Sequence, residues 1–152
     1  TSLRLINSTL NAIGEEDMYA TLDIAVLDLY AGNLEFIKNG ACPTYVKNNR
    51  NVQILKSLSL PTGILNDIDL VVYDKDLQDG DILIMCSDGI LESSKEYTNK
   101  ELWLKFLLEE IETEDMQKIA DIILQEAIDN NYGMPKDDMT VIVLKVKNTT
   151  IK

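Results

Sequence analysis

Acidic side chains stand at the ends of two apolar segments, an arrangement that can hold a metal ion. Asp88 follows the apolar run Ile82–Cys86 after one intervening residue, and Asp137 and Asp138 come directly before the largely apolar run 139–144. Such runs are typical of buried strands, where a carboxylate is costly unless a cation neutralises it. We therefore expect Asp88 and Asp137 to lie at strand ends in one sheet system and to form a shared site.

The chemistry of such a site would be that of hard divalent ions. Carboxylate oxygens are the ligands that Mg²⁺ and Mn²⁺ prefer, and these ions would activate a water and attract the oxygens of a phosphate group. Gly89 would let the backbone approach an ion closely, because it has no side chain. Ser87 could hydrogen-bond a carboxylate or be an ordinary turn serine, and the sequence leaves both readings open.

Simpler explanations exist for the same residues. Asp-Gly and Asp-Asp pairs are common in turns and at strand starts, and each pair alone would mean little. Asp88 could also cap a short helix that begins after the strand.

Composition limits the classes of function. With 152 residues, 45% of them hydrophobic, the chain is expected to fold as one domain around a single core. Its 26 acidic and 14 basic residues give a net charge of −12, which argues against nucleic-acid binding. The absence of histidine excludes histidine-ligated zinc sites and Ser-His-Asp triads from this sequence.

The sequence predicts a cytoplasmic segment. No apolar stretch approaches the roughly 18 residues that a membrane span requires, and no signal peptide is present. Cys42 and Cys86 are expected to be free and reduced. Because the chain begins at Thr1 without a methionine, we expect a piece of a longer protein, whose remainder could carry a membrane anchor.

Hydrophobic periodicity predicts a helix, a run of antiparallel strands, two helices and a last strand, which is an α+β fold. A capping box formed by Thr98 and Glu101 is expected to begin the second helix. Trp103, Phe106 and the methionines are expected in the core. The predicted helices cover residues 3–13, 98–107 and 116–127, and the predicted strands cover 21–30, 34–37, 44–46, 52–55, 69–73, 82–86 and 139–146.

Four motifs resemble, in the same order, those of the metal-dependent (type 2C, PPM) protein serine/threonine phosphatases. They are a Gly-x-x-Pro turn at 40–43, a Leu-Pro-x-Gly loop at 60–63, Ser-Asp-Gly at 87–89 and Asp-Asp-Met-Thr at 137–140. The helix around 7–10 and the strand beginning at 20–23 are most similar to the sporulation branch of that family. The motifs do not separate this branch firmly from its stress-response relatives.

The resemblance implies an α-β-β-α sandwich of antiparallel sheets flanked by helices, with two Mn²⁺ or Mg²⁺ ions. In such an enzyme a metal-activated water attacks phosphoserine directly. Carried over by motif, Asp88 and Asp137 are metal ligands, and Asp138 orients them or their waters with support from Ser87 and Gly89. The implied substrate is the phosphorylated form of a small anti-sigma-factor antagonist protein, whose dephosphorylation controls a sporulation sigma factor.

The sequence also departs from the family pattern. The family's metal-bridging aspartate lies in a Gly-Asp-Gly element, and no such triplet occurs here. Residues 1–152 are therefore expected to form a partial, C-terminal portion of the phosphatase domain that lacks the N-terminal strands. We expect this segment alone to bind metal weakly and to have little or no activity. Missing strands would leave an exposed sheet edge, so a homodimer is expected.

A second hypothesis belongs to another class of function. The chain would be a non-catalytic regulatory or binding module that keeps the phosphatase fold. The residues that precede Thr1 in the parent protein would discriminate the two, because a Gly-Asp-Gly there favours the enzyme.

Overall fold

A computed structural model describes residues 2–13, 19–28, 30–65, 72–94 and 98–147. The chain divides into two compact units, and each is described by itself. The first unit comprises Thr1–Ala41 and Lys56–Asp76, and the second comprises Cys42–Leu55 and Leu77–Lys152.

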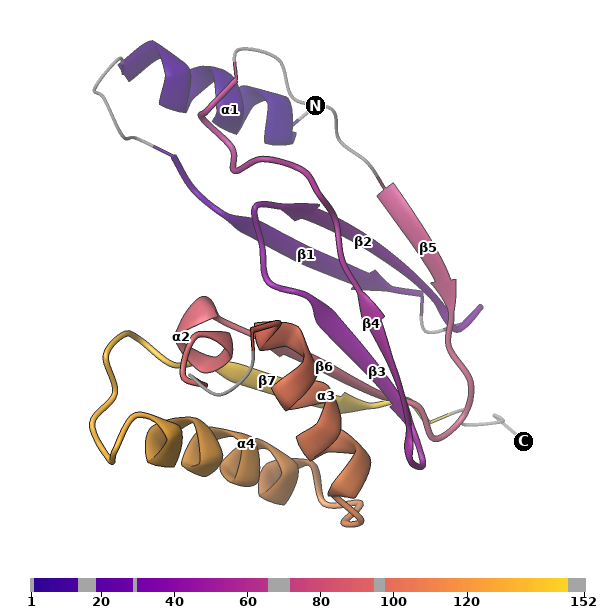
Figure 1. Cartoon of the computed structure of the whole chain (residues 1–152). Coiled ribbons are helices and arrows are strands. Elements are labelled where there is room, and N and C mark those ends of the chain that lie inside the picture. Colours follow the sequence, from indigo (N-terminus) through magenta and orange to yellow (C-terminus); the bar gives the residue numbers. More distant parts are fainter. Residues whose placement is uncertain (1, 14–18, 29, 66–71, 95–97, 148–152) are drawn as a thin grey trace. The chain divides into compact units, whose positions relative to one another are not determined.

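The first unit is a three-stranded antiparallel sheet with one helix (Figure 1). Its strand order is β1-β2-β5, and Phe36 of β2 pairs with Tyr73 of β5, their rings stacked at a centroid distance of 5.0 Å. The β1–β2 hairpin turns where Asp28 accepts hydrogen bonds from two backbone N–H groups and Gly32 adopts a φ of 71°. The elements are α1 (Ser2–Ile13), β1 (Leu22–Leu27), β2 (Asn33–Asn39) and β5 (Val72–Asp76).

One buried asparagine joins α1 to the loop that carries the Leu-Pro-x-Gly motif. The Asn7 side chain donates to the Leu65 carbonyl at 2.9 Å and accepts from the Gly63 N–H at 2.8 Å. The same loop meets the Gly-x-x-Pro turn, since the Gly40 N–H donates to the Ser59 carbonyl at 2.9 Å. The first residue of the Gly-x-x-Pro turn also approaches the second motif itself, since a Cβ on Gly40 would lie 2.4 Å from Pro61 Cγ.

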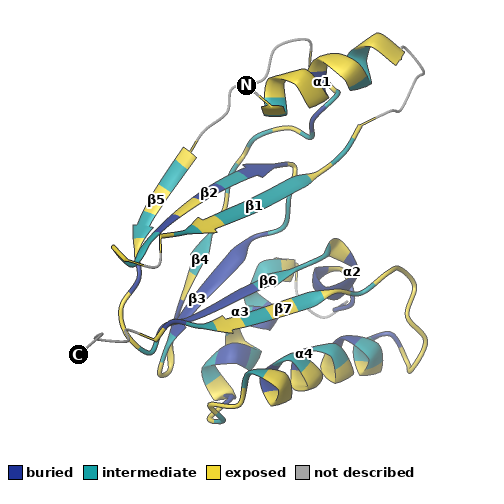
Figure 2. Ribbon diagram, turned by 180° about the vertical axis from the view of Figure 1, so that it is seen from behind, coloured by how far each residue is buried: buried dark blue, intermediate teal, exposed yellow. Residues whose placement is uncertain are grey.

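The second unit is a four-stranded antiparallel sheet covered by helices (Figures 1 and 2). Its strand order is β4-β3-β6-β7, and α3 and α4 pack on this sheet. The core lies between sheet and helices, where Tyr45 and Ile84 meet Leu104, Leu108 and other apolar side chains with almost no exposure. The elements are β3 (Thr44–Asn48), β4 (Asn51–Leu55), β6 (Ile82–Cys86), α2 (Asp88–Leu91), α3 (Lys100–Glu110), α4 (Met116–Asn130) and β7 (Val141–Lys145).

Two buried polar side chains connect β3 to α3. Lys47 donates through Nζ to the Leu108 carbonyl at 2.6 Å and to the Asn49 carbonyl, and burial lowers the pKa of its ammonium group. The Tyr45 hydroxyl donates to the Glu101 carbonyl at 3.1 Å. Both side chains reach from β3 to backbone carbonyls of α3, so these bonds help to fix the helix on the strand.

The mixed α+β class, the antiparallel pairing and the predicted order of the main elements are confirmed. The short helix after the first acidic strand end is also present as α2, with Ser87 rather than Asp88 at the N-cap position. Cys42 and Cys86 form no disulfide within the described residues, as expected. In the described residues, no helix is long and apolar enough to cross a membrane.

Some predicted details are wrong. The N-cap of α3 is Asn99, not Thr98, and its side chain accepts from the Glu101 N–H. Phe106 is 42% exposed and Met134 72% exposed, so neither is a core residue, whereas Trp103 is buried. The strand expected at 69–73 is found as β5 at 72–76, and residues 69–71 lie outside the described residues. The first and last strands, expected at 21–30 and 139–146, are shorter than predicted.

Candidate metal centre

The pairing of β6 with β7 brings the two acidic motifs to one end of the second sheet. The strands are antiparallel neighbours, and Cys86 at the end of β6 pairs with Val141 at the start of β7. The residues that follow β6 and those that precede β7 therefore lie at the same end of the sheet, as Figure 2 shows for α2 and the start of β7. The predicted meeting of the two strand ends is confirmed.

Ser87 joins the two motifs through their backbones. Its hydroxyl donates to the Asp138 carbonyl and accepts from the Thr140 N–H, both at 3.0 Å, and its own N–H donates to the Thr140 carbonyl at 3.0 Å. Of the two readings that the sequence left open for Ser87, the structure therefore shows a backbone role and no bond to a carboxylate.

Gly89 lies where the two motifs come closest. A Cβ at this position would be 2.4 Å from the Asp138 carbonyl oxygen and 3.4 Å from the Asp137 Cβ. The first of these distances is far below any ordinary contact, so only glycine fits here without a shift of the backbone. Residue 89 must therefore be glycine for the backbone of residues 137–138 to lie this close.

The carboxylates of Asp88 and Asp137 are exposed and similarly arranged. Asp88 accepts through Oδ1 from the Gly89 N–H at 3.0 Å, and Asp137 accepts through Oδ1 from the Asp138 N–H at 2.8 Å. Within the described part of the chain, the second oxygen of each carboxylate has no protein partner. Each aspartate can therefore offer an oxygen to a cation while the other oxygen fixes its orientation.

A cavity of about 180 Å³ lies beside Asp137. It is lined by Gly89, Glu92, Asn131, Lys136 and Asp137. Asn131 is 5% exposed, although its side-chain amide makes no hydrogen bond within the described residues. Sequence reasoning missed Asn131 and Lys136; the only signals were the position of Asn131 at the end of a helix and of Lys136 next to Asp137.

The donor set fits a divalent ion in part. Two free carboxylate oxygens and a close-packed glycine suit a hard cation. However, the described ranges contain no group of three or more histidine, cysteine, aspartate or glutamate side chains that could hold one. Asp138 contributes its backbone to the Ser87 bond, and its carboxylate is exposed at the same edge.

Solved structures identify the class to which this fold belongs. The phosphatase domain of the cell-fate determinant SpoIIE from Bacillus subtilis, in a crystal form without domain swapping, matches 99% of the chain with a TM-score of 0.82 and 37% identity. A manganese-presoaked form of that domain matches 98% of the chain with a TM-score of 0.79. In each case the chain covers 66% of the solved chain. The fold is that of a type 2C protein phosphatase domain.

The family follows from the sequence comparisons. The family model described as stage II sporulation protein E matches residues 1–147, and the chain belongs to this family. It is 37% identical over 151 residues to stage II sporulation protein E of Bacillus subtilis and 36% identical over 151 residues to that of Priestia megaterium. Both matches cover 99% of the chain, which spans 18% and 26% of these two relatives.

Proposed function

We propose that this chain is part of a metal-dependent protein serine/threonine phosphatase. The observation that carries the proposal is the junction of the two acidic motifs, where Gly89 and Ser87 hold the backbone of Asp138 against the end of β6. Membership of the family supports the same conclusion.

Asp88 and Asp137 would hold Mn²⁺ or Mg²⁺ through their free carboxylate oxygens. Such ions supply an acidified water and attract phosphate oxygens when they are bound. The chain's own part is to orient the two carboxylates, since the N–H groups of Gly89 and Asp138 each fix one oxygen of the preceding aspartate. The exposed carboxylate of Asp138 would orient the ligands or their waters.

The proposed substrate is phosphoserine on a small anti-sigma-factor antagonist protein in the control of sporulation. The support is the family and its named relatives. The cavity beside Asp137 adds a physical argument, because Lys136 could neutralise part of a phosphate charge at the edge of a strongly acidic chain. The buried amide of Asn131 could hydrogen-bond a peptide group of the bound protein.

A complete site needs at least one further carboxylate. The chain contains no Gly-Asp-Gly triplet, and the two aspartates form a small ligand set for two ions. We therefore propose that the isolated chain binds metal weakly and has little or no phosphatase activity. Strong Mn²⁺-dependent release of phosphate by the isolated chain would disprove this part.

The experiment is an Asp88→Asn substitution in the chain together with the sequence that precedes Thr1 in its parent protein. We expect Mn²⁺-dependent hydrolysis of a phosphoserine protein to fall at least 100-fold, because the substitution removes an anionic ligand. Circular dichroism should remain unchanged, since Asp88 is exposed. Asp121→Asn on the exposed face of α4 is the matched control and should keep full activity. Retained activity in Asp88→Asn would refute the assigned role.

The alternative is a regulatory or binding module with the phosphatase fold and no catalysis. The small number of clustered carboxylates among the described residues is the observation that favours it. Calorimetry with Mn²⁺ separates the enzyme from the regulator. It is performed on the extended chain, which is this chain together with the sequence that precedes Thr1 in its parent protein. A regulator would bind the ion no better than its Asp88→Asn variant does.

A further inference from the structure

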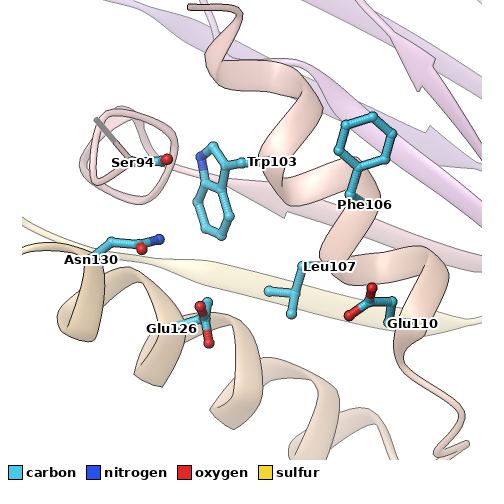
Figure 3. Close-up of a pocket in the computed structure, with 7 residues that line it drawn as sticks. All are labelled: Ser94, Trp103, Phe106, Leu107, Glu110, Glu126 and Asn130. Carbon is cyan, nitrogen blue, oxygen red and sulfur yellow. The ribbon is translucent and has the colours of Figure 1, made fainter. Parts of the chain in front are cut away.

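A second cavity lies on the helical side of the second unit, between α3 and α4 (Figure 3). Its volume is about 200 Å³, which is the size of one large side chain. None of its residues belongs to the acidic motifs of the candidate metal centre. It is lined by Ser94, Trp103, Phe106, Leu107, Glu110, Glu126 and Asn130.

Two carboxylates from different helices border this cavity. Glu110 ends α3 and Glu126 lies in the last turns of α4, and Figure 3 shows both with Leu107 between them. Neither glutamate forms an ion pair in the described part of the chain. The nearest lysine in sequence to Glu110, Lys105, is paired with Glu109. The two carboxylates therefore have no ion-pair partner among the described side chains, and the nearest cation at the cavity edge is the Lys105 ammonium, 5.6 Å from the centroid of the Phe106 ring.

A serine hydroxyl also faces the cavity. Ser94 is only 4% exposed, yet its hydroxyl makes no hydrogen bond to any described residue. Figure 3 shows its oxygen on the side of Trp103. The Asn130 amide is a further polar group that lines the space without a hydrogen bond within the described ranges. Both groups line the cavity with their hydrogen-bonding capacity unused by the described residues, so they can bond to a polar ligand that enters it.

The walls between these polar groups are aromatic and aliphatic. Trp103 is 4% exposed and is fixed by a hydrogen bond from its indole N–H to the Leu91 carbonyl at 3.0 Å. Phe106 is 42% exposed at the edge of the cavity. A rigid aromatic wall next to two carboxylates suits a flat, weakly hydrated cation better than a metal ion, which prefers oxygen ligands on all sides.

We propose that this cavity binds an arginine side chain from a basic surface segment of a partner protein. The guanidinium group has five donors in a planar fork, enough for both glutamates, the Ser94 hydroxyl and the Asn130 carbonyl oxygen. Its face can pack on the aromatic wall, and one such side chain fills a cavity of this volume. The net charge of −12 draws a basic segment toward the chain.

The single tryptophan makes the proposal directly measurable. Trp103 is the only tryptophan in the sequence, so fluorescence excited at wavelengths that the six tyrosines do not absorb reports this cavity. The probe is a capped tripeptide with arginine between two glycines, titrated at low ionic strength with a chelator present. We expect a saturable change in emission that is at least tenfold weaker with citrulline in place of arginine, because citrulline lacks the charge.

Variants assign the binding to the two carboxylates. Glu110→Gln and Glu126→Gln should each weaken the arginine peptide at least fivefold, whereas Glu112→Gln, which removes the same charge outside the cavity, should leave its affinity within twofold. All three glutamates are exposed, so the fold should be retained. The proposal is overturned by an absence of saturation, by an equal effect of Glu112→Gln, or by a lysine peptide that binds as tightly. Because no metal is used, failure here leaves the phosphatase proposal unaffected.

Discussion

At Gly89, a Cβ atom in place of the corresponding Cα hydrogen would clash with the backbone of Asp138. The glycine occupies a helical position in α2, and the Asp138 carbonyl lies against it. The sequence pattern identified Gly89 correctly as a place of close approach. The neighbour is the backbone of the second motif, which no local pattern can predict because it lies about fifty residues further along the chain.

The Gly89→Ala substitution tests this contact. Alanine would gain about 1 kcal/mol of helix propensity over glycine. Overpacking against the Asp138 carbonyl should cost about 1–3 kcal/mol and displace the 137–138 backbone. We expect a net loss in the free energy of unfolding, measured in urea, and a weaker affinity for Mn²⁺ in calorimetry on the extended chain. An unchanged Mn²⁺ affinity would contradict the role of this contact.

Gly80→Ala is the control for Gly89→Ala. Gly80 has a φ of 89° with nothing within 4 Å of an added Cβ, so alanine there introduces backbone strain without a clash. It should reduce stability by roughly 1–2 kcal/mol and leave Mn²⁺ affinity unchanged.

At the scale of elements, the sequence predicted the three longer helices and the start of α4 at Met116, but it placed the start of α3 two residues too early. Thr98 and Asn99 are adjacent, and both can cap a helix. The structure selects Asn99, whose extended backbone (φ −99°, ψ 100°) places its side chain on the Glu101 N–H. Similarly, Trp103 and Phe106 lie three positions apart on α3, yet only Trp103 is turned into the core. Such choices depend on tertiary packing, which sequence periodicity does not contain.

Tyr45 provides a test of how β3 and α3 pack. Its pKa is raised well above the ordinary value, first by burial and then by the nearby Cys86. In the unfolded chain the phenol ionises near pH 10, whereas in the folded state it remains neutral, so the folded state loses stability relative to the unfolded state above that pH. Below about pH 9 the contribution is fully present.

The measurement compares the protein with Tyr45→Phe by urea unfolding from pH 8 to pH 11. Tyr45→Phe should cost about 1 kcal/mol at pH 8 through the lost bond to the Glu101 carbonyl. That difference should shrink above pH 10 by up to roughly 1.4 kcal/mol per pH unit. Tyr30→Phe, at a position that is 98% exposed, is the control and should show no such trend. A difference that grows with pH would contradict the burial argument.

At the scale of the whole chain, sequence reasoning predicted the class of fold and the meeting of the two acidic motifs at one end of a sheet. It did not predict the division into two compact units, because the segment Lys56–Asp76 separates the two parts of the second unit along the chain. It also missed Asn131 and Lys136, which reach the cavity beside Asp137 from a helix end and a loop. Composition and motif spacing do not show which residues from different elements line the same cavity.

Self-association is the prediction that belongs to this scale. The outer strands β1 and β7 expose apolar side chains, with Val26 57% and Ile142 56% exposed. We expect light scattering to show a homodimer whose fraction rises with concentration, and rises further in salt, because salt screens the repulsion between chains of charge −12. Ile142→Lys and Val26→Lys should identify which edge pairs. A monodisperse monomer at all concentrations would contradict the prediction.

The pairing of β6 with β7 also has a consequence for synthesis on the ribosome. β6 is made before α3 and α4, and its partner β7 is the last described strand. Until β7 emerges, the apolar strand β6 pairs with β3 only and leaves its other backbone edge open. Open apolar edges are prone to aggregation, so a nascent chain that stalls before Val141 should be a substrate for chaperones and proteases. When β7 pairs with β6, it covers the open edge of β6 and brings Asp137 to the end of the sheet where Asp88 lies.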